Sequence, residues 1–355
     1  MINLLEPPAR AVLYIALMVM VGLPIGLYGV VLPIFHRHGI SGQLILGTAR
    51  RIQAIAALAM LAGATAFFIA QVVPLELEFG SLAEWVEFTR RSLLGQMWIA
   101  RLVLGLIALA ALKLVMSPTA GLVACASAGL AAQTTITLTG HSAAMGEGWM
   151  PVAADFAHLL AGALWGGGLV ILWVAVHHVA RSRTPQSAEM VRALIRRFSP
   201  FGIAGVALVA GTGVALSSLH VADADALRNS DYGRLILLKA LLTVGAVAFA
   251  ALHKFATQQQ LKSHADVRRF SRTLLAELAL VIGVFFGAAL LSSTAPAHQY
   301  VTHQMPDGST HTMPITDPDF QRALRIVALA TLAVGAIACA LEWRARLKTS
   351  SEVKV

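Results

Sequence analysis

The stretch from residue 294 to residue 320 carries the side chains that point most directly to chemistry. It reads TAPAHQYVTHQMPDGSTHTMPITDPDF, and its imidazole and thioether donors are His298, His303, Met305, His311 and Met313. The tetrapeptide H-x-M-P occurs twice, on either side of Asp307-Gly308, which is a strong turn signal. A turn there folds the two segments back on each other, and alternate residues of an extended segment share a face. Because thioether and imidazole together favour copper, Cu(I) especially, over hard cations, we predict a copper site here; the alternative is an ordinary polar loop.

A second loop, from residue 140 to residue 151, repeats the same donor types. It reads GHSAAMGEGWMP, with His141 and Met145 spaced by four and Glu147 close by. Residues four apart share a face of a helix, so His141 and Met145 are candidate metal ligands. The alternative is a turn at the membrane surface that is anchored by Trp149.

Asp155 and His158 follow this loop inside an apolar run. A spacing of three places both on one helical face, and at about 1.5 Å of rise per residue His158 lies roughly two turns from the start of the run. Ionisable groups inside a membrane are costly and are usually functional. We predict that the pair continues a metal path from the loops; the alternative is a structural hydrogen bond. Gly162, Gly166 and Gly167 then let a neighbouring helix approach closely.

Three more charged residues interrupt apolar runs: Arg101, Lys239 and Glu277. Arg101 and Lys239 lie at a depth similar to that of Asp155, so they either pair with it or hold an anionic ligand. Glu277 lies in the other half of the membrane. It marks an exit or a proton site, or it pairs with Arg272, whose long side chain can reach the surface.

The elements that position these residues must be transmembrane helices. Of the 355 residues, 57% are hydrophobic and 13% are charged, with a mean hydropathy of +0.73, whereas soluble domains carry about 25% charged residues. Apolar runs of this length span a bilayer as helices, which satisfy every backbone group internally. We predict an all-α transmembrane bundle of nine spans, at about residues 10–32, 51–73, 94–116, 119–139, 152–176, 200–219, 233–254, 273–293 and 322–343.

The basic residues fix the expected orientation. They gather in every second connection and in the C-terminal tail, for example at Arg50, Arg196, Arg269 and Arg344, while loops 140–151 and 294–320 contain no Lys or Arg. Because cytoplasmic loops are rich in Lys and Arg, we expect the N-terminus outside and the C-terminus inside. The net charge of +9 is therefore a topology signal, and we expect membrane lipid rather than nucleic acid as its partner.

We divide the chain into a two-span region (1–93), a membrane core (94–297), and a last part (298–355) that holds the His/Met loop, the last span and the tail. Segment 81–91 alternates Leu82, Trp85 and Phe88 with two glutamates, which is typical of a short helix at the interface or of an ordered loop. The sequence contains no phosphate-binding loop and no large soluble part for an ATPase. Any transport is therefore passive or driven by an ion or redox gradient.

Between about residues 94 and 297 short motifs occur in a fixed order. They are GQMWIAR (95–101), TGH (139–141), DFAHLLAGALWGGGL (155–169), RFS (197–199), DYGRLILLK (231–239), ELAL (277–280) and the pair Ala295-Pro296. This series resembles the CopD family, the inner-membrane copper resistance and uptake proteins. The ninth span and the His/Met loop extend the family's common eight-span pattern.

The resemblance implies a protein of the bacterial inner membrane that is not an enzyme and that passes copper from the periplasm to the cytoplasm. It also implies a separate periplasmic CopC-like chaperone as the copper donor. Two alternatives remain. The CopD family is distantly similar to HemJ-type haem proteins, so His141, His158 and His220 are candidate axial ligands of a haem b, with Arg101 or Lys239 at its propionates. The third interpretation is a copper sensor or assembly factor without transport.

Overall fold

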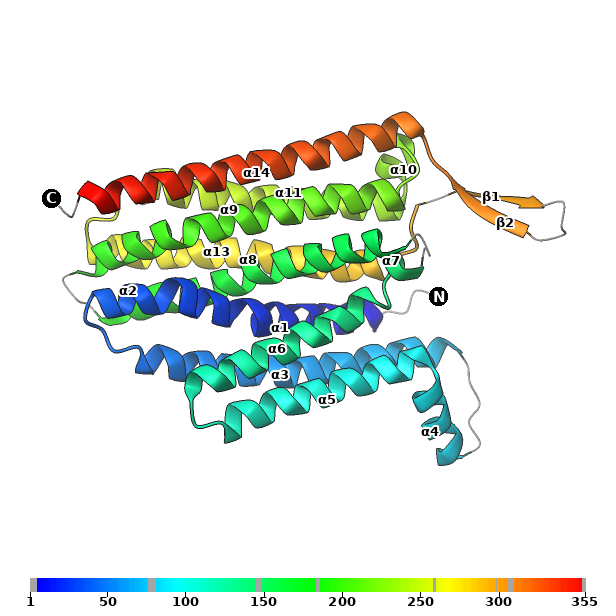
Figure 1. The fold of residues 1–355 in the computed structure, drawn as a ribbon, viewed down its shortest axis with the longest axis horizontal. Helices are drawn as coiled ribbons and strands as arrows, with labels where there is room; N and C mark the ends of the chain where they lie inside the picture. Colours follow the sequence, from blue (N-terminus) through cyan, green and yellow to red (C-terminus); the bar gives the residue numbers. More distant parts are fainter. Residues whose placement is uncertain are drawn as a thin grey trace.

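The protein is a bundle of long helices (Figure 1), seen in a computed structural model that describes residues 5–75, 81–144, 148–182, 186–257, 260–297, 299–304 and 310–352. Within these residues nine helical segments are long and apolar enough to cross a membrane: Glu6–Arg37, Gln43–Leu75, Leu93–Leu114, Pro118–Thr137, Trp149–Ser182, Ser187–His220, Asp231–Phe255, His264–Ser292 and Pro318–Arg344. The predicted nine-span helical bundle is confirmed.

The elements follow one another in this order: α1 (Glu6–Gly26), η1 (Leu27–Val31), α2 (Leu32–Arg37), α3 (Gln43–Val72), η2 (Val73–Leu75), α4 (Leu82–Arg91), α5 (Leu93–Leu114), α6 (Pro118–Thr137), α7 (His141–Ala144), α8 (Trp149–Ser182), α9 (Ser187–His220), α10 (Ala224–Asn229), α11 (Asp231–Leu252), η3 (His253–Thr257), α13 (His264–Ser292), β1 (Gln299–Gln304), β2 (Thr310–Ile315) and α14 (Pro318–Glu352). The strands, the short helices α7 and α10, and the helix α4 all lie at one end of the bundle, here called the hairpin end (Figure 1). Helix α1 begins at the hairpin end and α14 finishes at the opposite end.

The first helix forms the centre of the bundle. It packs against α3, α6, α8 and α13, and most of its residues are buried, including Leu17, Met18, Met20 and Leu23. A helix that is apolar on every side can be surrounded by other helices or by lipid, and α1 is surrounded by helices. Helix α14, by contrast, packs mainly on α9 and exposes large apolar residues such as Ile326 and Leu329. Its other faces are therefore suited to contact lipid.

Helix α1 makes its closest backbone contact with α8. A Cβ added to Gly22 would lie 1.8 Å from the carbonyl oxygen of Ala163, and one added to Gly167 would lie 2.3 Å from the carbonyl oxygen of Met18. Both distances are far below van der Waals contact, so only glycine permits the two backbones to touch. The expected close approach of a neighbouring helix is confirmed for Gly166 and Gly167, where the neighbour is α1; Gly162 instead faces the ring of Phe285 on α13.

The strands β1 and β2 form an antiparallel hairpin between α13 and α14. Their register pairs His303 with His311 and Val301 with Met313. The described parts of the two H-x-M-P segments, residues 303–304 and 311–314, thus lie on paired strands as expected, while Met305, Pro306 and the predicted turn at Asp307-Gly308 lie outside the described residues. Segment 81–91 is helical rather than a loop: α4 starts after Ser81, whose hydroxyl accepts a hydrogen bond from the backbone N–H of Glu84.

We predict that Gly167→Ala lowers the stability of the bundle. The added methyl group meets backbone atoms of α1 that have no room to move, and overpacking of this kind costs about 1–3 kcal/mol. Thermal unfolding in detergent micelles measures the effect as a lower midpoint. The control is Gly47→Ala on α3, where the new Cβ meets no atom within 4 Å. An equal midpoint for the two variants would contradict direct backbone contact between α1 and α8.

Candidate functional site

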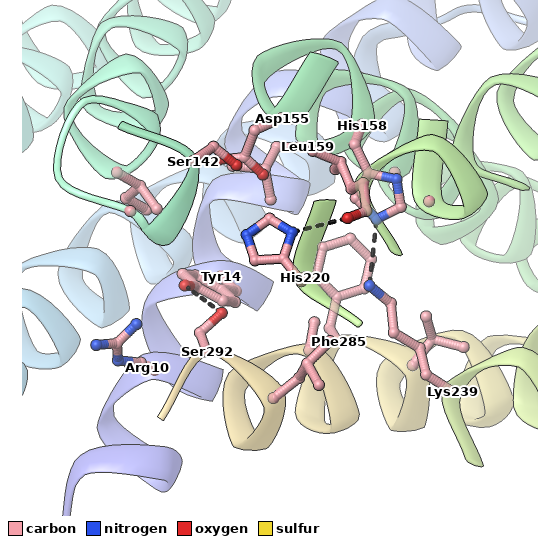
Figure 2. A pocket seen from close by; sticks show the side chains of 18 of the residues that line it. Arg10, Tyr14, Ser142, Asp155, His158, Leu159, His220, Lys239, Phe285 and Ser292 are labelled. Carbon is pink, nitrogen blue, oxygen red and sulfur yellow. Dashed lines mark hydrogen bonds between the residues drawn. The ribbon is translucent and has the colours of Figure 1, made fainter. Parts of the chain in front are cut away.

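A cavity of about 710 Å³ lies inside the bundle near the hairpin end. Every described spanning helix except α14 contributes to its walls. The walls are mostly apolar, and the ionisable groups on them are Arg10, Arg101, Asp155, His158, His220, Tyr14, Tyr232 and Lys239. Figure 2 shows Asp155, His158 and His220 close to one another, with Lys239 reaching His158 from the other side. Largely apolar cavities with a few converging polar groups are typical binding sites.

Helix α8 brings Asp155 and His158 to this cavity, as the spacing of three predicted. His158 reaches across to α9, where its Nδ1 lies 3.0 Å from Oγ1 of Thr212. The Thr212 hydroxyl donates its own proton to the carbonyl oxygen of Leu208. It must therefore accept from His158, which places the imidazole proton on Nδ1. The lone pair on Nε2 then faces the cavity side, where a metal ion or a donor can bind it.

Lys239 occupies that position. Its Nζ lies 3.2 Å from Nε2 of His158, contributed from α11. An ammonium group donates hydrogen bonds only, so Lys239 donates to the Nε2 lone pair. A cation tethered to the protein thus stands where a copper ion would bind His158. Sequence analysis offered Lys239 as a partner of Asp155; the hydrogen bond of Lys239 is with His158 instead.

Arg101 is 2% exposed and does not pair with Asp155 either. Its Nε donates to Oγ1 of Thr135 at 2.8 Å, and its Nη2 lies 3.3 Å from the carbonyl oxygen of Thr135 and 3.4 Å from Oγ1 of Thr139. Among the described residues no carboxylate lies within ion-pair distance of this guanidinium. Uncharged groups therefore surround a buried positive charge at the cavity wall, the oxygens of two threonines and the ring of Phe67 at 5.8 Å from Cζ. That wall favours an anionic group.

His220 connects the cavity to the hairpin. Its Nδ1 donates to the carbonyl oxygen of Leu216 at 2.7 Å, and its own carbonyl oxygen accepts from the backbone N–H of Ala297 at 3.1 Å. The N–H of Ala222 donates to the carbonyl oxygen of Ala297 at 3.1 Å, and the N–H of Asp317 donates to the carbonyl oxygen of Ala222 at 3.0 Å. Both ends of the hairpin segment are thus fixed beside a histidine of the cavity wall.

Glu277 forms a separate buried site towards the opposite end. It is 2% exposed, and its Oε2 lies 2.8 Å from Nδ1 of His253. The other nitrogen of His253 lies 3.0 Å from Oγ1 of Thr273. Sequence analysis expected Glu277 to be an exit or proton site or to pair with Arg272. The partner of Glu277 in the structure is His253, not Arg272. Sequence reasoning missed His253, which no spacing connects with a residue on another helix.

The remaining predicted ligands are not brought together by the described residues. His298, Met305 and Met145 lie outside them. His303, His311 and Met313 are placed by their backbones in the hairpin, and His141 begins α7. In the described part of the chain no three His, Cys, Asp or Glu side chains converge as a metal site. Any copper site there uses fewer such groups, or adds thioethers and other donors.

These features define a class: a multi-pass membrane protein with an ionisable cavity at one end of its bundle. Residues 192–291 match the family described as copper resistance protein D, and residues 1–152 match the N-terminal domain of copper resistance protein D-like proteins. The chain belongs to the CopD family. Both matches leave out the hairpin and α14, and motif 155–169 lies between them.

Two further similarities come from individual proteins. The copper transport protein CutJ of Bacillus subtilis (strain 168) is 28% identical over 184 residues, which are 50% of this chain and 32% of that protein. The chain thus matches only about a third of the length of this relative. The bd oxidase of Geobacillus thermodenitrificans superposes over 97% of this chain and 98% of its own, with 12% identity and a TM-score of 0.49. A score this low does not establish a shared fold.

We predict that Lys239→Leu raises the affinity of the purified protein for Cu(I). The substitution removes the donor that competes for Nε2 of His158, and an increase of about tenfold corresponds to about 1.4 kcal/mol. Competition titration against a Cu(I) chelator in detergent measures the change. Lys239→Arg keeps the positive charge and serves as the control. We expect its affinity for Cu(I) to stay as low as that of the wild type. Equal affinity in the wild type and the Leu variant would show that Lys239 does not compete with copper.

Proposed function

We propose that the protein imports copper across the bacterial inner membrane, from the periplasm to the cytoplasm. The observation that supports this most directly is the cavity, where Asp155, His158 and His220 lie beside the base of the hairpin. Membership of the CopD family supports copper as the ion. The hairpin end then faces the periplasm, in agreement with loops 140–151 and 294–320, which lack Lys and Arg.

The first step of the path is capture at the hairpin. Its register pairs His303 with His311, and Met313 adds a thioether to the same strand pair. These donors suit Cu(I) delivered by a separate periplasmic chaperone of the CopC type. His220 connects the hairpin base to the cavity through its backbone, and His141 begins the neighbouring short helix α7.

The second step is binding in the cavity. Copper takes the Nε2 lone pair of His158 and displaces the Nζ of Lys239, with Asp155 as a carboxylate on the same helix. The displaced ammonium remains in a cavity that also holds the Asp155 carboxylate, so an acceptor for it is close by. Copper entry then exchanges one positive charge for another at His158. The buried pair of His253 and Glu277 provides the last ionisable group of the path before the cytoplasm.

The test of transport is His158→Gln in a copper-accumulation assay in cells. We expect accumulation to fall to the level of cells without the protein, because the variant loses Nε2 of His158, the ring nitrogen that would bind copper in place of Lys239. His177→Gln is the matched control: it makes the same change on the same helix, where His177 stacks on Trp173 at a ring-centroid distance of 5.3 Å and lies outside the cavity. Accumulation equal to wild type in His158→Gln would exclude His158 from the path.

A membrane haem b protein is the second candidate, and the cavity gives it one supporting observation. Its volume of about 710 Å³ is much larger than one metal ion requires, and His158, His220 and the Arg101 guanidinium share its walls. Ligation of haem iron by His158 would also require Lys239 to leave Nε2. Elemental analysis after copper loading under reducing conditions separates the two functions. We expect copper near one or more per chain without iron; iron near one per chain with a Soret absorption band would establish haem instead.

A further inference from the structure

A second, much smaller cavity lies next to the large one, deeper in the bundle. It has a volume of about 10 Å³ and shares Tyr14, Ile136, Leu159 and Phe285 with the walls of the large cavity. A space of this size holds about one water molecule or one ion. The residues that belong to the small cavity alone are Leu17, Met18, Gln133 and Ala163. Two of these four side chains carry a donor atom, and both are almost completely buried.

Gln133, on α6, is the first of the two. It is 3% exposed, and within the described residues its buried Nε2 has no hydrogen-bond partner. A buried amide without a partner costs about 1–3 kcal/mol, and such groups in folded proteins usually have a ligand, an ion or a water beside them. The nitrogen and oxygen of a carboxamide exchange places by a simple flip. Gln133 can therefore present either a donor or an oxygen ligand to the small cavity.

Met18, on α1, is the second. It is 1% exposed, and its Sδ lies against α8, where a Cβ added to Gly166 would come within 2.4 Å of the sulfur. Glycine at position 166 thus leaves the space that the thioether fills. A thioether binds Cu(I) and has little affinity for hard cations such as Mg²⁺ or Ca²⁺. The small cavity therefore adds a soft ligand directly beyond a site whose ligands are imidazole and carboxylate.

We propose that the small cavity is a second copper site, in which Sδ of Met18 and the carboxamide oxygen of Gln133 bind Cu(I) after it leaves His158. This proposal rests on the proposed function and extends it inward by one step. Tyr14 stands between the two cavities, and its hydroxyl donates to Oγ of Ser292 at 3.2 Å. Copper passes this side chain to reach Met18. A thioether at this point selects Cu(I) from the cations that the outer site also admits.

The test compares two identical substitutions, Met18→Leu and Met60→Leu. Both methionines are buried in neighbouring helices, at 1% and 0% exposure, but only Met18 lines either cavity. The full-length protein carries Met97→Leu, Met145→Leu, Met305→Leu and Met313→Leu in addition, so that neither the wall of the large cavity nor the predicted thioether ligands of the two loops contribute sulfur. It is purified, loaded with Cu(I) under reducing conditions, and measured by copper K-edge EXAFS. In parallel, copper accumulation is measured in cells for Met18→Leu, Met60→Leu, Gln133→Leu and His158→Gln in the otherwise native chain.

We expect a sulfur shell in the background protein and in Met60→Leu, and its loss in Met18→Leu. Accumulation should fall about tenfold in Met18→Leu and Gln133→Leu, and stay at the wild-type level in Met60→Leu. A sulfur shell that survives in Met18→Leu, or normal accumulation in both Met18→Leu and Gln133→Leu, overturns the second site and leaves the small cavity to a water molecule. If only His158→Gln loses accumulation, the proposed import stands without this site. If none of the variants loses it, import itself fails.

Discussion

The contact of two helix backbones at Gly22 and Gly167 determines how the rest of the protein is built. It sets α1 against α8 with no side chain between them, and α8 carries both Asp155 and His158. A membrane interior offers little hydrophobic drive for helix association, so close packing through small residues supplies much of the attraction. With the two backbones in contact at the middle, the helices are free to leave room for side chains towards the hairpin end. The large cavity lies in this region, with α1 and α8 both in its walls.

The hydrogen-bond partners of the ionisable groups in the cavity can be explained by the cost of placing a charge in an apolar environment. An uncompensated ion is expensive there, so each ionisable side chain needs partners from other helices. Lys239 finds an imidazole lone pair and His158 finds a threonine hydroxyl. Arg101 finds Thr135 on α6 and Thr139, two residues after α6 ends. These partners are neutral. Neutral partners bind more weakly than a carboxylate does, and so they release a cation more readily when a ligand arrives.

The sequence predicted what depends on a single helix. The apolar runs predicted nine spans, the spacing of three predicted that Asp155 and His158 share a face, and the glycines of α8 predicted a close neighbour. The sequence could not predict which side chains meet between helices, because such a contact depends on the rotation and the depth of two helices at once. Lys239 was expected to pair with Asp155 or to hold an anionic ligand, and its hydrogen bond is with His158. Glu277 was expected as an exit or proton site or as a partner of Arg272, and it contacts His253. Gln133 gave no signal at all, since its unpartnered amide is visible only once α1, α6 and α8 are packed together.

The order of the donors along the bundle has a physical consequence. The hairpin combines imidazole and thioether. The large cavity offers imidazole and carboxylate, with the thioether of Met97 also on its wall, and the small cavity offers thioether and carboxamide. A monovalent ion that moves inward gives up its charged partner and keeps only neutral ones, so the step costs less for Cu(I) than for any divalent ion. Lys239 acts in the same direction, because its ammonium stays in the cavity after it leaves His158, so the cavity gains the full charge of the entering ion. A divalent ion would add two positive charges to this apolar setting where Cu(I) adds one, and the second charge is a barrier against it.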